Sequence, residues 1–181
     1  MAPCVFIITG LMASGKSTVA EELARRFARS VHVRGDLFRR MVVSGRADMT
    51  PDPSPEASAQ LALRYDLACA TVDAYAAAGF DVVYQDVILG PRLAAIAQRL
   101  ANWNPDVIVL DPSLDVVAQR DRDRDKTAYR GAWTPAALAT ALDETPRLGL
   151  WLDTSGLSVA QTVDHIVHHF GLTPRTRGET P

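Results

Sequence analysis

The sequence predicts an α/β protein built on a parallel sheet that is covered by helices on both faces. Short apolar segments alternate with helical patterns along almost the whole chain. Several apolar segments, such as 5–9 and 107–110, show no alternation of apolar and polar residues, which is typical of strands buried on both faces. A glycine-rich turn also separates the first strand from the first helix. Because parallel strands need long crossover connections, these three observations favour one doubly covered sheet.

The first half of the chain contains three predicted strands and three predicted helices. The strands are expected at 5–9, 31–34 and 80–85, and the helices at 16–29, 37–44 and 55–78. Ser54 before Pro55 is a good helix start, and Gly79 ends the long third helix. The face of this helix that packs inward is predicted to carry Ala59, Leu63, Leu67, Ala70, Ala74 and Ala77.

The second half continues the alternation. Strands are expected at 107–110 and 148–152, and helices at 92–101, from Pro112 into 120–126, at 135–144 and at 159–170, the last capped by Ser158. Right-handed crossovers bring the loops that follow the strands to the carboxyl edge of the sheet, where α/β proteins bind ligands. These loops are 10–17, 35–36, 85–90 and 153–157.

Length and composition restrict the class of protein. The 181 residues suffice for one domain, expected over 1–171, with a flexible tail over 172–181. The formal net charge of −2 argues against an extended nucleic-acid footprint. Cys4 and Cys69 lack metal or redox spacing and suit a reducing compartment. No membrane-length apolar run occurs and the first strand begins early, so we expect a cytoplasmic protein without a membrane partner.

The turn after the first strand carries a phosphate-binding signature. Gly10, Gly15, Lys16 and Ser17 satisfy G-x-x-x-x-G-K-[ST], the Walker A motif, between a strand and a helix as that motif requires. Glycine torsions turn successive N–H groups inward, and the helix N-terminus adds partial positive charge. The predicted nucleotide-binding residues are Gly10, Leu11, Met12, Ala13, Ser14, Gly15, Lys16, Ser17 and Thr18. Lys16 is a predicted catalytic residue that reaches the β- and γ-phosphates, and Ser17 a predicted Mg²⁺ ligand.

Two aspartates follow predicted strands at the same edge. Asp36 is placed to accept the proton of an attacking hydroxyl, unless it only caps the next helix. Arg39 is three residues further on and is predicted to lie beside Asp36 and hold an anionic or polar acceptor. Asp86 ends an apolar run in the Walker B manner, which predicts a Mg²⁺ ligand at the acceptor site. Either aspartate fits the role of base.

A mixed-charge stretch predicts a lid at about 120–133. Arg120 and Arg124 share a helical face and are the predicted lid residues that bind the triphosphate and stabilise charge during transfer. The alternative is a solvated helix end whose acids cancel the arginines. Thr154, after the last strand, is predicted to flank the adenine ring, with an ordinary turn as the alternative.

With these residues assembled, the chain resembles small P-loop kinases over nearly its full length, and chloramphenicol phosphotransferase and its relatives most of all. The likeness lies in 10–17, 35–36, 85–90 and 152–154. Gluconate, shikimate and polynucleotide kinases look similar in layout. The resemblance implies a three-layer P-loop kinase fold with a five-stranded sheet in the order 2-3-1-4-5, and Asp36 as the base. The substrate region, about 36–65, departs from chloramphenicol phosphotransferase in its proline loop and helix.

The favoured interpretation is an ATP- and Mg²⁺-dependent kinase that phosphorylates a hydroxyl of a small molecule, such as an antibiotic, a sugar or another metabolite. One alternative is a nucleoside, nucleotide or polynucleotide 5′-kinase, which the near-neutral charge does not favour. The other is a nucleotide-binding switch or interaction module, although the Asn/Thr-Lys-x-Asp loop of guanine-selective switches is absent from the sequence. The expected partner is thus a small-molecule acceptor, and the sequence specifies no oligomeric state.

Overall fold

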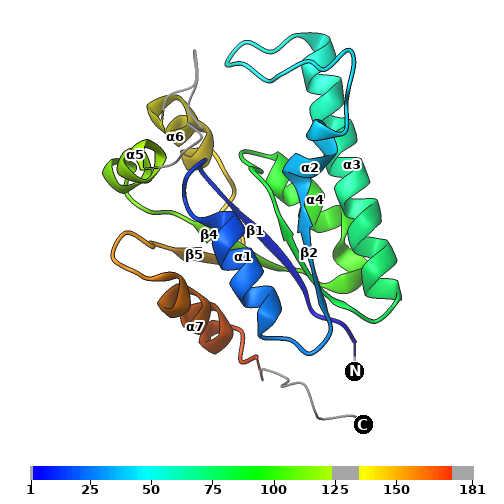
Figure 1. Ribbon diagram of the computed structural model, residues 1–181, viewed down its shortest axis with the longest axis vertical. Helices are drawn as coiled ribbons and strands as arrows, with labels where there is room; N and C mark the ends of the chain where they lie inside the picture. Colours follow the sequence, from blue (N-terminus) through cyan, green and yellow to red (C-terminus); the bar gives the residue numbers. More distant parts are fainter. Residues whose placement is uncertain (1, 124–134, 173–181) are drawn as a thin grey trace.

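A five-stranded parallel sheet organises the computed structural model, which describes residues 2–123 and 135–172 (Figure 1). The strands are β1 (Val5–Gly10), β2 (Ser30–Arg34), β3 (Asp81–Gln85), β4 (Asp106–Leu110) and β5 (Leu150–Leu152). Their order is β2-β3-β1-β4-β5, and every neighbouring pair is parallel. The predicted fold class and strand order are therefore confirmed.

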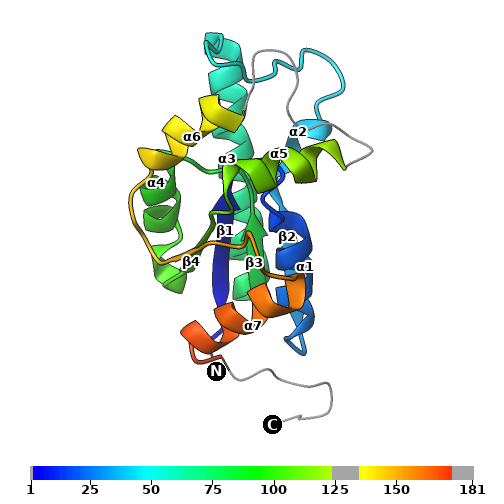
Figure 2. The ribbon, with the colours of Figure 1, turned by 90° about the vertical axis from the view of Figure 1, so that its left-hand side faces the viewer.

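Helices cover both faces of this sheet. They are α1 (Lys16–Arg25), α2 (Gly35–Arg40), α3 (Pro55–Ala77), α4 (Arg92–Arg99), the short 3₁₀ helix η1 (Ala101–Trp103), α5 (Leu114–Arg122), α6 (Pro135–Asp143) and α7 (Val159–His169). In Figures 1 and 2, α1 and α7 lie on one face and α3 and α4 on the other, while α5 and α6 lie beyond the carboxyl ends of the strands. Among the described residues, no helix is both long and apolar enough to cross a membrane.

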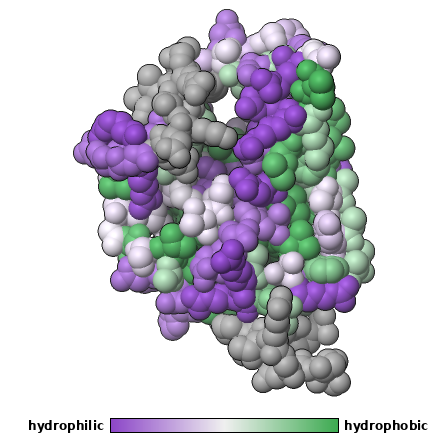
Figure 3. All heavy atoms as spheres, viewed as in Figure 1, coloured by the Kyte–Doolittle hydropathy of each residue, from purple (hydrophilic) through white to green (hydrophobic). Residues whose placement is uncertain are grey.

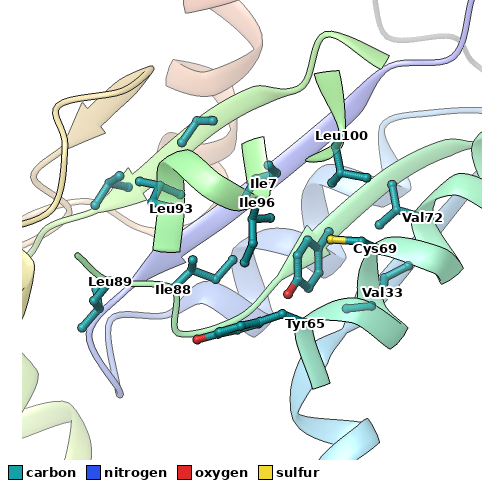
Figure 4. Packing of buried hydrophobic residues seen from close by; sticks show 14 of the residues in the cluster. Ile7, Val33, Tyr65, Cys69, Val72, Ile88, Leu89, Leu93, Ile96 and Leu100 are labelled. Atoms are coloured by element: carbon teal, nitrogen blue, oxygen red, sulfur yellow. The ribbon is translucent and has the colours of Figure 1, made fainter. Parts of the chain in front are cut away.

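The central strand β1 contributes to two separate hydrophobic cores. Val5 and Ile7 pack toward α3 and α4, whereas Phe6 and Ile8 pack toward α1 and α7. Successive side chains of a strand point to opposite faces, so a strand covered on both sides is apolar at every position. Figure 4 shows the α3/α4 side, where Tyr65 and Cys69 lie among aliphatic side chains.

Several helix boundaries differ from the predicted ones. Helix α1 ends at Arg25 rather than at 29, because Phe27 turns into the core against Phe6, with ring centroids 5.6 Å apart. Helix α2 begins at Gly35 with Arg34 as its N-cap residue, so the alternative in which Asp36 only caps this helix is wrong. Helix α5 begins after Ser113, whose hydroxyl accepts from the Val116 N–H, rather than at Pro112.

The predicted inward face of α3 is also wrong. All six predicted positions are exposed, and Leu63 and Leu67 are 53% and 42% exposed. The buried residues of α3 are Ala57, Tyr65, Ala68, Cys69, Val72 and Ala76. Because alanine and leucine occur around most of the helix, their spacing does not single out one face. Part of α3 also extends beyond the sheet (Figure 1). Leu63 and Leu67 line a cavity instead of packing in the core.

We predict that Gly149→Ala destabilises the fold by about 2–4 kcal/mol, because it adds a steric overlap to backbone strain. Gly149 has φ +66°, and a Cβ there would overlap the carbonyl oxygen of Val107 at the start of the β4–β5 pairing. Gly79→Ala is the matched control, since Gly79 has φ +79° but no heavy atom within 4 Å of its Cβ position. We expect the control to lose only about 1 kcal/mol in urea unfolding. Equal losses would contradict the overlap.

Candidate active site

The loop between β1 and α1 has the backbone of a phosphate cradle. Gly10 and Gly15 have φ values of +139° and +96°, and Ala13 between them has φ +63°. A Cβ at Gly10 would overlap the Leu110 carbonyl of the neighbouring strand, so glycine is required by space as well as by torsion. Gly15 is the N-cap of α1, which places the helix N-terminus directly behind the loop. The loop thus has the conformation expected of an anion-binding nest.

The predicted phosphate contact Lys16 and the predicted Mg²⁺ ligand Ser17 are the first two residues of α1. Lys16 is 7% exposed, and its Nζ donates to the carbonyl of Leu11 at 2.6 Å, across the turn. The Ser17 hydroxyl donates to Oε1 of Gln85, the last residue of β3, at 3.4 Å. An ammonium group and a hydroxyl therefore lie together where the phosphate loop meets the neighbouring strand.

Two hollows meet at the phosphate loop. The larger, of about 1490 Å³, is bounded by the loop, α2, the segment after α2, and α3. The smaller, of about 380 Å³, lies between α1, α5 and the segment after β5. Ala13 and Gly15 line both hollows. A nucleotide can therefore place its phosphates on the loop with its base in the smaller hollow, leaving the larger one for a second substrate.

The larger hollow, called the acceptor cavity below, has both polar and apolar walls. In Figure 3, hydrophilic residues gather beside the hydrophobic outer side of α3. Apolar lining comes from Phe38 of α2 and from Leu61, Leu63 and Leu67 of α3. The exposed leucines that were predicted to be core therefore form part of this cavity.

Asp36 lines the acceptor cavity together with Lys16 and Ser17. Its side chain is 30% exposed and forms an ion pair with Arg40, with the Arg34 Nε 3.8 Å from its Oδ1. Oδ1 is buried and accepts no hydrogen bond from any described residue, so the protein leaves its hydrogen-bonding capacity unused. Arg39 does not lie against Asp36 as predicted, because its guanidinium is paired with Asp48. It still lines the same cavity.

Asp86 is joined to a residue that the sequence analysis did not select. Arg64 of α3 donates through Nε and Nη2 to the two carboxylate oxygens, with Nε–Oδ2 at 2.8 Å. Asp86 also accepts from the Val87 N–H, and its side chain is 1% exposed against 15% for Arg64. Gly35 permits this arrangement, since a Cβ there would overlap the Asp86 carboxylate. The sequence signal for Arg64 is that it is the lone arginine of an Ala- and Leu-rich helix.

The contacts of Ser17 and Asp86 test whether these two predicted Mg²⁺ ligands can share a metal ion. Among the described residues, no group of three His, Cys, Asp or Glu side chains is arranged to hold a metal ion. Ser17 and Gln85 nevertheless supply two neighbouring oxygen donors, which suit Mg²⁺ because it takes most of its ligands from phosphates and water. Both oxygens of Asp86 accept from Arg64 instead. The metal role of Asp86 therefore remains a prediction, and its contacts favour an anchoring role toward Arg64.

Arg120 lines the smaller hollow, called the base-side hollow below. Its Nη1 donates to the Ser14 carbonyl at 3.3 Å and its Nη2 to the Thr154 carbonyl at 2.8 Å. This guanidinium thus joins α5 to the phosphate loop and to the loop after β5. Thr154 is buried, with a hydroxyl that has no hydrogen-bond partner among the described residues. Arg124 and residues 124–133 of the predicted lid lie outside the described residues, as do residues 173–181 of the predicted tail.

A comparison with known families agrees with this geometry. The family model described as AAA domain matches residues 5–145. The chain belongs to this AAA domain family. The matched residues include the phosphate loop, both aspartates, Arg64 and Arg120. A search of curated proteins finds no match to this AAA domain protein.

Solved structures share its fold. A sugar kinase from Janibacter sp. HTCC2649 has a TM-score of 0.67 at 17% identity, covering 95% of this chain and 96% of that one. The Deinococcus radiodurans tunicamycin resistance protein has a TM-score of 0.70 at 18% identity, with 97% and 99% covered. A gluconokinase from Sinorhizobium meliloti 1021 has a TM-score of 0.61 at 16% identity, with 94% and 93% covered. The AAA domain of this chain therefore has the P-loop kinase fold.

We predict that Asp86→Ala destabilises the protein by about 3–5 kcal/mol, because it leaves the Arg64 guanidinium unpaired in a largely buried position. Asp48→Ala is the matched control, since Asp48 also pairs with a cavity arginine, Arg39, but half of its side chain is exposed. We expect the control to lose less than about 1 kcal/mol in urea unfolding. A loss for Asp86→Ala no larger than that of the control would contradict the anchoring role.

Proposed function

We propose that this protein is an ATP- and Mg²⁺-dependent phosphotransferase that moves the γ-phosphate of ATP to a hydroxyl of a small molecule. The observation that carries the proposal is that the phosphate loop opens into a second-substrate cavity lined by Asp36, whose Oδ1 accepts no hydrogen bond from a described residue. Similarity to a sugar kinase and a gluconokinase supports the proposal at the level of the fold. The same proposal places the enzyme in the cytoplasm, where ATP is supplied.

The transfer requires few protein groups. Asp36 orients the acceptor hydroxyl and takes its proton as the hydroxyl oxygen attacks the γ-phosphorus. The new oxygen–phosphorus bond forms while the bond between the γ-phosphorus and the bridging oxygen of the β-phosphate breaks. ADP, the phosphate ester and one proton are the products. Lys16 and the loop N–H groups stabilise charge on the phosphates, and Arg120 closes the base-side hollow. Mg²⁺, when bound, neutralises phosphate charge and would be held by Ser17 and, through water, by Gln85.

The direct test is a measurement of ADP release in the presence and absence of candidate alcohols. A set that includes sugars, antibiotics, nucleosides and oligonucleotides also separates the small-molecule reaction from 5′-kinase activity. We expect ATP consumption to depend on an added small alcohol and to yield its phosphate ester, identified by mass spectrometry. ATP consumption that is slow and unaffected by every acceptor would favour the nucleotide-binding switch.

We predict that Lys16→Ala weakens binding of a non-hydrolysable ATP analogue at least about tenfold, because a charge-assisted contact to phosphate is lost. Arg25→Ala is the control, since Arg25 carries the same charge on the same helix but is exposed and lines neither hollow. Titration calorimetry gives both dissociation constants. Unchanged affinity in the Lys16 variant would remove this side chain from phosphate binding.

We predict that Asp36→Asn lowers kcat about 10²- to 10⁴-fold and leaves the dissociation constant for ATP essentially unchanged, because the amide cannot accept the proton. Asp48→Asn is the control within the same cavity. Steady-state kinetics with an acceptor identified in the screen gives kcat, and calorimetry gives the affinity for nucleotide. Parallel losses of turnover and nucleotide affinity would count against Asp36 as the base.

A further inference from the structure

The acceptor cavity concentrates positive charge. Besides Lys16 at the phosphate loop, its walls contain six arginines. They are Arg34, Arg39, Arg40, Arg46, Arg64 and Arg92. Four acids face the same cavity, namely Asp36, Asp48, Asp86 and Glu144. Seven basic groups against four acidic ones leave an excess of three positive charges, in a protein whose formal net charge is −2.

The ion pairs in these walls do not neutralise the excess. Arg34 and Arg40 share the single carboxylate of Asp36, and Arg39 and Arg46 share that of Asp48. Arg92, the first residue of α4, has no ion pair with any described residue. Arginines that share or lack a carboxylate are available to a further anion.

Two of the arginines, Arg64 and Arg92, line the cavity together with Tyr65. Tyr65 packs at the base of the cavity, and its hydroxyl donates to the Val87 carbonyl at 2.7 Å. Burial raises the pKa of Tyr65, and the positive charges of Arg64 and Arg92 oppose that rise. Asp86 occupies Nε and Nη2 of Arg64, which fixes the plane of the guanidinium and leaves Nη1 without a hydrogen bond to a described residue.

The geometry points to an anion subsite between Arg64 and Arg92, which binds a carboxylate, phosphate or sulfate group of the acceptor. That an anion subsite exists is inferred from the cavity alone. That its ligand is the acceptor of the reaction rests on the proposed function. Planar guanidiniums bind such groups through paired hydrogen bonds, and Arg64 is already oriented. The acceptor class is therefore an alcohol that also carries an anionic group, with its carbon skeleton against Leu63 and Phe38.

The first test compares alcohols in matched neutral and anionic pairs, such as a sugar with its sugar acid and a hydroxy ester with its hydroxy acid. We expect kcat/KM, measured by ADP release, to favour the anionic member at least about tenfold, and Arg92→Gln to remove that preference. Arg99→Gln is the matched control on the same helix, since Arg99 is half exposed, pairs with Asp66 and lies outside the cavity. Equal rates for both members, unaffected by Arg92→Gln, would overturn the subsite and leave the kinase proposal standing.

The second test does not need turnover. With the nucleotide site filled by a non-hydrolysable ATP analogue, citrate is titrated into the protein by calorimetry. We expect binding that Arg92→Gln weakens about tenfold and Arg99→Gln leaves unchanged. Arg64→Lys, which keeps the charge but loses the paired geometry, should weaken it as well. Arg92-dependent citrate binding without phosphorylation of any alcohol would support the subsite and refute the kinase. Absence of citrate binding, or binding unaffected by Arg92→Gln, would overturn the subsite.

Discussion

The contact between Gly10 and the carbonyl of Leu110 fixes the point at which the phosphate loop leaves the sheet. On the other side of β1, the Thr9 hydroxyl donates to the Ile88 carbonyl and accepts from the Ile88 N–H, at 2.9 and 2.8 Å. The end of β1 is thus fixed on one side by β4 and on the other by the segment that follows β3. Because the core buries the strand on both faces, the loop has a rigid base from which to bind phosphate.

Asp86 fixes the elements around the acceptor cavity, as the contacts of Gly10 and Thr9 fix the phosphate loop. Its carboxylate contacts the start of α2 at Gly35, binds Arg64 of α3, and accepts from the backbone after β3. Burying a charged pair costs desolvation free energy, and such pairs add little to stability compared with apolar packing. What the pair provides is a fixed position for one guanidinium at the base of the cavity. We therefore interpret it as a feature of specificity.

The phosphate loop and the doubly covered parallel sheet were predictable from sequence because each has a local or strongly patterned signal, whereas the strand order came only from the resemblance to P-loop kinases. The Walker A spacing specifies its own backbone, and unbroken apolar runs indicate strands covered on both faces. The inward face of α3 was not predictable, because Ala and Leu surround the helix and only the position of the sheet selects Tyr65 over Leu63. Arg64 and Arg92 were missed for a related reason. Their roles depend on elements that lie apart in sequence and meet only in the folded cavity.

The charge distribution has a mechanistic consequence. A kinase whose acceptor is an anion must bring that charge close to a polyphosphate, and two like charges 4 Å apart repel by about 4 kcal/mol at an effective dielectric constant of 20. Carboxylates shared between two arginines leave a net positive charge on the walls of the acceptor cavity while still fixing the arginine side chains. A neutral acceptor needs no such compensation. The unbalanced arginines are therefore better explained by the substrate than by the fold, since exposed ion pairs contribute little to stability.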